Sequence, residues 1–205
     1  MLENGVWETA GLHHNATAIG ARYVRRVKPN GKYKTRLCGR GFNMVKGIDY
    51  TETFAPVAKM ATLRIFLSLI AIFNLYSSSL DVKTAYLNAH IKEDVYMIPP
   101  DDLLPQLKLL FERSTNEDHK KIIKNQMRKI NLGHVLKLLK AIYGTKQGGR
   151  EWFLLIDEYF KSIGFKSNKV DNCFYTLIEG NDYVILLLYV DDIILAATTE
   201  ELEQR

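Results

Sequence analysis

In the stretch YVILLLYVDDIILAATTE, residues 183–200, two acids stand side by side within an apolar, otherwise uncharged run that extends from Tyr183 to Ala197. Asp191 and Asp192 follow seven apolar or aromatic residues (184–190) and precede five more (193–197). A lone buried carboxylate costs several kcal/mol unless it is paired, hydrogen-bonded or bound to a metal. Two interpretations are therefore open on this stretch alone: a β-hairpin whose two-residue turn is Asp-Asp, or a metal site.

Asp81 and Gln147 are the other polar residues whose positions suggest chemistry. Asp81 ends a short predicted strand in SSSLDVKTAYLN, residues 77–88, which continues into a turn or a helix start. Gln147 lies in a glycine-containing loop that precedes a predicted helix.

The net charge of +5 hides an uneven distribution of charge along the chain. Residues 9–48 contain nine basic residues and no acid, a second basic cluster falls within 120–129, and acids gather toward the C-terminus. One interpretation is a solvated surface that is basic by accident. We favour a surface that faces phosphates, because no acid compensates the block. Its members are Arg22, Arg25, Arg26, Lys28, Lys32, Lys34, Arg36, Arg40 and Lys46.

Residues 21–37, ARYVRRVKPNGKYKTRL, predict a β-hairpin with its turn at Pro29-Asn30-Gly31. Because side chains alternate along a strand, Lys34, Arg36 and, if the return strand continues, Arg40 share one face. One face of this ribbon is therefore predicted to be cationic.

Apolar periodicity predicts two helices, one buried in 60–75 and one in 150–163 that stops at Gly164. The apolar positions of the first are Leu63, Phe66, Leu67 and Ile70, and those of the second are Trp152, Ile156, Tyr159, Phe160 and Ile163. Residues 172–190 predict a hairpin that turns at Gly180-Asn181.

Residues 101–133 are polar, charged and weakly helical, with 114–116 as a helix start, which is typical of an inserted surface element. Hairpins and helices alternate irregularly, without the rhythm of a parallel sheet, so we expect an α+β fold.

Composition sets the remaining limits. The 205 residues are 47% hydrophobic and 25% charged, as in globular proteins rather than disordered ones. We expect no membrane association, because no run reaches the roughly 20 apolar residues of a span, and no secretion signal. Two cysteines, Cys38 and Cys173, do not make a disulfide framework, which suits a reducing compartment.

Five blocks in order resemble the copia-type reverse transcriptases of LTR retrotransposons. They are YKTRLCGRGF, GIDYTETFAPVAKMATLR, LDVKTAYLN, AIYGTKQGGREWF and LLYVDDIIL. The resemblance implies a right-hand polymerase fold with fingers and palm only, the thumb being absent because the chain ends at Arg205. It divides the chain into an N-terminal fingers part with the basic hairpin and buried helix (1–80), a first palm segment (81–96), a second fingers segment with the basic insertion (97–143) and a palm part with the Asp-Asp hairpin (144–205).

The resemblance also implies roles for individual residues. Asp81, Asp191 and Asp192 are the expected catalytic residues and metal ligands, with a backbone oxygen of Val82 as a further ligand. We expect Asp191 to be the firm ligand and Asp192 the weaker one, because adjacent strand residues point to opposite sides. The expected nucleotide and nucleic-acid contacts are Tyr86, as the aromatic steric gate that excludes a 2′-hydroxyl, and Gln147. Lys34, Arg36 and Arg40 are the candidates for contacting the triphosphate, and which of them does so stays open.

The activity implied is RNA-directed DNA polymerisation with two Mg²⁺ ions, or Mn²⁺ as a substitute. The expected partners are an RNA template, a DNA primer, deoxynucleoside triphosphates and the thumb and RNase H segments of a Pol polyprotein. The expected location is the cytoplasm, or an element particle if a full polyprotein is made, with the nucleus as an alternative.

Two alternatives to an active polymerase stay open: a truncated or domesticated relic that keeps the fold and nucleic-acid binding, and a purely structural α+β domain. The relic draws support from departures from the family pattern. Gly148 and Gly149 replace an Ala-Pro after Gln147 and are expected to loosen that loop. The connection at 105–133 is also longer than in the family.

Overall fold

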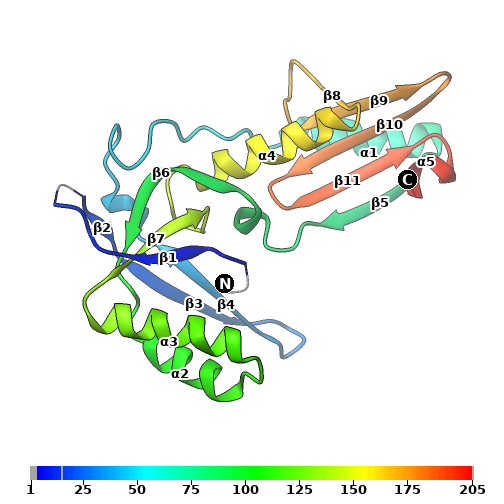
Figure 1. The fold of residues 1–205 in the computed structure, drawn as a ribbon. Helices are drawn as coiled ribbons and strands as arrows, with labels where there is room; N and C mark the ends of the chain where they lie inside the picture. Colours follow the sequence, from blue (N-terminus) through cyan, green and yellow to red (C-terminus); the bar gives the residue numbers. More distant parts are fainter. Residues whose placement is uncertain (1–3, 15, 205) are drawn as a thin grey trace. The chain divides into compact units, whose positions relative to one another are not determined.

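The structure, a computed structural model, describes residues 4–14 and 16–204 and is a mixed α/β protein (Figure 1). Its chain forms two compact units. Unit 1 comprises the chain up to Thr53 together with Tyr86–Gly148, and unit 2 comprises Phe54–Ala85 together with the chain from Gly149 onward. Each unit has its own sheet and its own apolar core, so each is described by itself.

Unit 1 contains a four-stranded sheet in the order β1-β7-β6-β2 and a separate two-stranded ribbon, β3-β4. The sheet strands are β1 (Trp7–Ala10), β2 (Ala18–Ile19), β6 (His90–Met97) and β7 (Val135–Lys140). The ribbon strands are β3 (Ala21–Val27) and β4 (Tyr33–Gly39), and the helices are α2 (Leu103–Arg113) and α3 (Glu117–Asn131). Two short 3-10 helices complete the unit, η1 (Gly41–Asn43) and η2 (Ala85–Asn88). The first residue of η2, Ala85, still belongs to unit 2.

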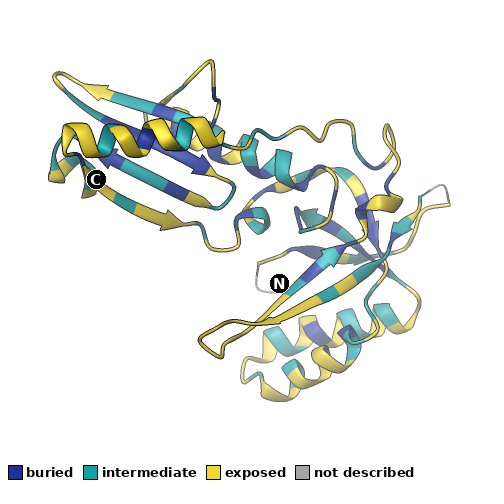
Figure 2. Ribbon diagram, turned by 180° about the vertical axis from the view of Figure 1, so that it is seen from behind, coloured by how far each residue is buried: buried dark blue, intermediate teal, exposed yellow. Residues whose placement is uncertain are grey.

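The ribbon confirms the predicted hairpin. Its strands pair antiparallel from Ala21 opposite Gly39 to Val27 opposite Tyr33. The turn is closed by the amide of Gly31, which donates to the carbonyl of Lys28 at 2.9 Å, and Gly31 takes the positive φ of 76° that glycine adopts without strain. Figure 2 shows the tip of this ribbon exposed.

The segment expected to be a weakly helical surface insertion is a pair of full helices packed on unit 1. The start predicted at 114–116 is confirmed: the side chain of Asn116 caps α3 by accepting a hydrogen bond from the amide of His119 at 3.0 Å. Leu103, Leu107 and Ile123 are buried in the same core as the strands β6 and β7. A pure surface element was therefore the wrong interpretation, because the apolar side of each helix belongs to the core.

Unit 2 contains an antiparallel five-stranded sheet in the order β5-β11-β10-β9-β8. The strands are β5 (Tyr76–Asp81), β8 (Lys166–Ser167), β9 (Phe174–Glu179), β10 (Asp182–Tyr189) and β11 (Asp192–Ala197). The helices are α1 (Met60–Phe73), α4 (Gly148–Ser162), whose first residue still belongs to unit 1, and the short α5 (Glu200–Gln204). The hairpin predicted to turn at Gly180-Asn181 is confirmed as β9-β10.

Helices α1 and α4 cover opposite faces of the unit 2 sheet. Phe66 of α1 lies edge-on to Phe174 with ring centroids 6.0 Å apart, and Phe160 of α4 lies against Tyr175 at 5.0 Å. Phe174 and Tyr175 are neighbours on β9, so their side chains point to opposite faces. This double cover explains why the central strand β10 is buried from Val184 through Leu188.

Both predicted helices exist, but the buried side of each is narrower than periodicity indicated. Leu67 of α1 is 50% exposed and Tyr159 of α4 is 56% exposed, and Ile163 lies past the end of α4 at 48% exposure. These expectations of burial were wrong, because the sheet contacts only the row of each helix that carries Phe66 or Phe160. Gly164 stops α4 as predicted, with φ of 99°.

Asp171, which is far from α1 in the sequence, holds the N-terminal end of α1 by hydrogen bonds. One carboxylate oxygen accepts hydrogen bonds from the amide of Lys59 at 3.0 Å and the hydroxyl of Thr62 at 2.5 Å, and the other accepts from the amide of Cys173 at 3.0 Å. Burial alone would raise the pKa of Asp171, but these hydrogen bonds and the charge of Lys59 outweigh it and hold the pKa below its ordinary value. Burial and the nearby Asp171 charge raise the pKa of the Cys173 thiol to about 12.

Within the described residues, none of the helices combines the length and the hydropathy that a membrane crossing requires. Both cysteines are free thiols.

Candidate active site

The two separate acidic signals of the sequence meet on neighbouring strands of the unit 2 sheet. Asp81 is the last residue of β5 and Asp192 is the first residue of β11, and they are direct partners in the antiparallel register. Tyr189, the last residue of β10, is the partner of Asp192 on its other side. Directly opposed residues project from the same face with Cβ atoms about 4.5–5.5 Å apart. Asp81, Asp192 and Tyr189 therefore form a row across three strands at one end of the sheet.

The turn between β10 and β11 is Val190-Asp191, not Asp-Asp, so the Asp-Asp turn considered from the sequence is wrong. Val190 has a φ of 58°, an outlier for a β-branched residue that costs about 1–3 kcal/mol. Two hydrogen bonds hold this turn: the indole nitrogen of Trp152 donates to the carbonyl of Val190 at 2.7 Å, and the amide of Val82 donates to the carbonyl of Asp191 at 2.8 Å. The turn is thus tied both to α4 and to the end of β5.

The carboxylates are not buried, which corrects the premise drawn from the apolar sequence around them. Asp81 and Asp192 are exposed, and Asp191 is half-buried. The apolar neighbours supply the sheet interior, whereas the acids stand at its end, where water can hydrate them. A metal is therefore not needed to make the acids compatible with folding.

The donor set fits a hard divalent cation in kind, because Mg²⁺ prefers carboxylate and carbonyl oxygens. The register makes Asp192, rather than Asp191, the direct partner of Asp81. Among the described residues, no group of three or more His, Cys, Asp or Glu side chains is arranged to hold a metal ion. The arrangement is therefore an opposed pair of acids with Asp191 in the adjoining turn.

The ribbon of unit 1 carries the predicted cationic face. Arg26 is opposite Lys34, and Arg36 is opposite Val24 two pairs further along, so these side chains share one face with Arg22. Arg25 belongs to the other face, where its guanidinium forms an ion pair with Asp102.

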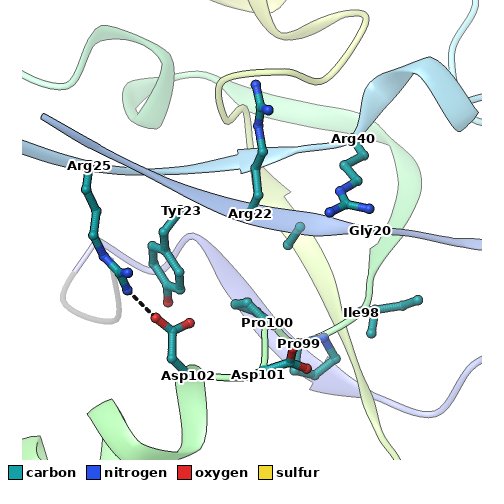
Figure 3. A pocket seen from close by; sticks show the side chains of 11 residues that line it. Gly20, Arg22, Tyr23, Arg25, Arg40, Ile98, Pro99, Pro100, Asp101 and Asp102 are labelled. Carbon is teal, nitrogen blue, oxygen red and sulfur yellow. Dashed lines mark hydrogen bonds and ion pairs between the residues drawn. The ribbon is translucent and has the colours of Figure 1, made fainter.

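Arg40 does not join this face, because β4 ends at Gly39 and Arg40 is the residue that precedes η1. Figure 3 shows its side chain directed toward Gly20 in a pocket that Ile98 also lines, while Arg22 points the opposite way. The structure thus brings Lys34 and Arg36 together and leaves Arg40 apart.

Tyr143, which sequence reasoning missed, connects two of the predicted nucleotide contacts within unit 1. Its ring centroid lies 4.4 Å from that of Tyr86 and 5.1 Å from the guanidinium carbon of Arg36. The glycines near Tyr143 were the sequence signal that could have indicated this close contact. In the structure, the amide of Gly39 donates to the carbonyl of Tyr143 at 2.8 Å, and the amide of Gly41 donates to the carbonyl of Gly144 at 3.0 Å. A Cβ on Gly41 would lie 2.1 Å from the carbonyl oxygen of Gly144, so only glycine permits this crossing of the two segments.

Gln147 is fully buried in unit 1. Its side-chain nitrogen donates to the carbonyl of Asp49 at 2.9 Å and, at 3.4 Å, to the carboxylate of Glu93. Its side-chain oxygen is buried without a hydrogen-bond partner among the described residues. The glycine that follows has a packing role that the sequence argument did not foresee, since a Cβ on Gly148 would lie 2.6 Å from the hydroxyl oxygen of Thr145.

Opposed carboxylates on neighbouring strands, together with a cationic ribbon in the other unit, fit the class of nucleic-acid polymerases, which use divalent cations held by carboxylates. Comparison with known proteins agrees. The family model described as reverse transcriptase (RNA-dependent DNA polymerase) matches residues 4–105 and 121–204. The residues it leaves unmatched, 106–120, run from α2 into α3, where the sequence indicated a longer connection than in the family.

The relatives are polyproteins of retrotransposons. The chain is 34% identical over 201 residues to the retrovirus-related Pol polyprotein from transposon TNT 1-94 of Nicotiana tabacum, a match that covers 95% of this chain and 13% of that protein. It is 32% identical over 186 residues to the Pol polyprotein from transposon RE1 of Arabidopsis thaliana, covering 88% of this chain and 11% of that protein. The Ty1-ER2 Gag-Pol polyprotein of Saccharomyces cerevisiae is 28% identical over 206 residues, covering 95% of this chain and 10% of that protein. No solved structure was found to match.

The chain belongs to the reverse transcriptase family, in the copia-type branch found in retrotransposon Pol polyproteins. It spans 13% or less of the length of the three relatives described.

Proposed function

We propose that this chain is the catalytic part of an RNA-directed DNA polymerase, in which unit 2 is the palm and unit 1 contributes fingers. The observation that supports this most directly is the register of β5 and β11, which sets Asp81 opposite Asp192 at the end of the sheet. In this proposal an RNA template, a DNA primer and deoxynucleoside triphosphates are the substrates, and the chain works within a Pol polyprotein.

Asp81 and Asp192 are the residues we expect to hold two divalent cations, Mg²⁺ or in its place Mn²⁺. Asp191 and a backbone oxygen of Val82 are further candidate donors. When bound, such ions supply activation of a primer 3′-hydroxyl and neutralisation of the triphosphate charge. The chain's own contribution is to place two carboxylates side by side on a rigid sheet, which Val82 and Asp191 tie together by a backbone hydrogen bond of 2.8 Å.

The residues of unit 1 are proposed to bind rather than to react. Lys34 and Arg36 present cations on one ribbon face to phosphates, and Tyr86 is the proposed steric gate for the sugar. Arg40 is a separate cation beside Gly20, and we assign it a weaker part in phosphate binding. Gln147 must leave its buried position before it can contact a nucleotide.

A second candidate function is nucleic-acid binding by a relic that no longer polymerises. Two observations favour it: the acids do not form a cluster of three ligands in the described part of the chain, and Gln147 is enclosed by its own unit. The cationic face of the ribbon would serve either function.

Primer extension distinguishes the two functions. We expect the chain, assayed within its Pol polyprotein, to extend a DNA primer on an RNA template with Mg²⁺ and deoxynucleotides. Asp81→Asn and Asp192→Asn each keep the size of the side chain and remove its charge, so each should reduce the rate at least about a hundredfold. Asp118→Asn is the matched control, because Asp118 is an exposed acid on a helix of unit 1 that forms a surface ion pair with Lys121 at 3.0 Å.

The control should extend at the parent rate. Extension by Asp192→Asn at the parent rate would show that the acid pair is not the metal site. A folded parent that binds primer–template but extends nothing, even within the polyprotein, would leave the relic as the better account.

A further inference from the structure

The indole of Trp152 is the contact that joins α4 to the turn carrying the acids. Trp152 is buried, with 4% of its surface exposed, and its nitrogen donates a 2.7 Å hydrogen bond to the carbonyl of Val190. Val190 is the residue directly before Asp191 and Asp192. The bond therefore acts on the backbone of the turn itself.

That backbone needs a restraint. Val190 has a φ of 58°, where glycine or asparagine is usual in a two-residue hairpin turn and a β-branched residue is strained. Strained conformations persist only where surrounding contacts determine them. The contacts identified on the turn backbone are the indole bond to Val190 on one side and the bond from the Val82 amide to Asp191 on the other.

We infer that Trp152 is a positioning residue: its indole N–H holds the strained Val190 turn and so keeps Asp191 and Asp192 in place beside Asp81. The expected effect on catalysis rests on the proposed function, whereas the expected effect on the stability of the turn does not. A turn released from the indole can relax toward ordinary φ values, which moves both acids relative to β5. Trp152 thus acts through the turn and is not proposed to contact a reacting group.

The chain supplies a matched control, because it has two tryptophans and both are buried. The indole nitrogen of Trp7, in unit 1, has no hydrogen-bond partner among the described residues. Trp7→Phe and Trp152→Phe therefore make the same chemical change, loss of an indole N–H with retention of an aromatic ring, and only the second breaks a hydrogen bond.

Amide hydrogen exchange tests the structural part without activity or metal. In Trp152→Phe, the Val82 amide should exchange at least about tenfold faster than in the parent, because the turn that accepts its hydrogen bond opens more often. In Trp7→Phe it should exchange within about twofold of the parent rate. Equal effects of the two variants, or none from Trp152→Phe, would overturn the inference.

The intact parent gives a second measurement if Trp152→Phe fails to fold. The indole proton of Trp152 and the amide proton of Val82 should have protection factors, each taken relative to the intrinsic exchange rate of its own kind of proton, within about threefold of each other, since both bonds break when the turn opens. An indole proton that is far less protected than the Val82 amide would mean that the bond does not hold the turn.

Kinetics tests the catalytic part. In a parent that extends primers, Trp152→Phe should lower kcat about fivefold to tenfold, equivalent to about 1–1.4 kcal/mol, and leave KM for the deoxynucleotide within about twofold. Trp7→Phe should change neither. If kcat is unchanged in Trp152→Phe, the inferred effect on the acids is wrong. A parent without activity contradicts the proposed function and leaves the exchange result to decide the role of the indole.

Discussion

Neutralising Asp192 should stabilise the metal-free protein and remove its stabilisation by Mg²⁺. Asp192 lies directly opposite Asp81 on the neighbouring strand, and like charges in this position destabilise a sheet. Asp192→Asn removes the repulsion but keeps the size and the hydrogen-bonding groups of the side chain. If the two opposed carboxylates serve to bind a cation, the metal-free protein should therefore become more stable when one of the two charges is removed.

The magnitude follows from the geometry. Charges about 5 Å apart repel by about 0.8 kcal/mol in water, and salt at 0.15 M, with its screening length of about 8 Å, reduces this to about 0.4 kcal/mol. The high dielectric constant applies because both acids are exposed. For a protein of this size the expected rise in Tm is about 1–2 °C. Mg²⁺ at ten times its Kd should stabilise the parent by about 1.4 kcal/mol, or about 3–6 °C, and Asp192→Asn by much less.

The assay can follow unit 2 alone. In a Trp7→Phe background, Trp152 is the sole tryptophan, and its hydrogen bond to Val190 makes its fluorescence a reporter for the turn. Thermal melts with and without Mg²⁺ are compared for this parent, for Asp192→Asn and for the control Asp118→Asn. The control should respond to Mg²⁺ as the parent does, because Asp118 lies on α3 in unit 1.

Two results would contradict a repulsive acid pair that binds the cation. A fall in the free energy of unfolding of about 1 kcal/mol in metal-free Asp192→Asn would mean that the carboxylate makes structural hydrogen bonds rather than repelling Asp81. Equal stabilisation of parent and variant by Mg²⁺ would place the bound cation elsewhere.

Two further predictions concern other parts of the chain. Lys34→Gln combined with Arg36→Gln should reduce the slope of log affinity for primer–template against log salt by about 1.4–1.8, as measured by fluorescence anisotropy. Arg25→Gln should change this slope little, because the Arg25 guanidinium is paired with Asp102. An unchanged slope in the double variant would mean that the ribbon is only a solvated surface. Asp171 has a depressed pKa, so the stability that it contributes is fully present above its ordinary value near 4 and is lost as the pH falls through the lower folded value. Asp171→Asn should cost about 1–2 kcal/mol at pH 7 in denaturant melts and flatten the acid limb of stability against pH, and an acid limb identical to the parent's would contradict this assignment.

Local patterns predicted the elements whose signals are local. The hairpin turn at Gly31 and the helix stop at Gly164 each depend on a residue at positive φ, and each was found where the sequence placed it. Side-chain burial was less predictable, because apolar spacing marks the side of a helix that could be buried and not the width of the contact. Leu67 and Tyr159 have helical spacing but lie beyond the reach of the sheet.

The four-stranded sheet of unit 1 could not be predicted from local pattern. Strand β1 has only four residues, and it pairs with β7 through the partnership of Trp7 with Leu138, far along the chain. The sequence-based division also grouped α1 with the basic hairpin, whereas α1 packs on the sheet that contains Asp81. Both differences arise because long-range pairing, not composition, decides which segments share a core.

At the candidate site, residue types were predictable and geometry was not. The order of blocks indicated that Asp81 and the Asp-Asp pair act together, and the sheet joins them. Which of the two acids faces Asp81 depends on a one-residue choice of turn, and a one-residue shift moves every side chain of β11 to the other face. Because the turn is Val190-Asp191, the partner is Asp192, the residue that sequence reasoning ranked second.

The buried amide of Gln147 bears on the proposed nucleotide contact, because that contact would require the side chain to move. Its nitrogen is held by the carbonyl of Asp49 at 2.9 Å, while its oxygen is buried without a partner among the described residues. An unsatisfied buried acceptor costs about 1–3 kcal/mol, which offsets much of what the bond to Asp49 contributes. The enclosed position of Gln147 is therefore less favourable than its complete burial suggests. In the proposed function, a rearrangement that carries Gln147 toward a nucleotide breaks the hydrogen bonds of its nitrogen to Asp49 and Glu93 and frees its oxygen to find a donor. Gly148 has no room for a larger residue, since a Cβ there would lie 2.6 Å from the hydroxyl oxygen of Thr145, so the loop that carries Gln147 is closely packed at this position.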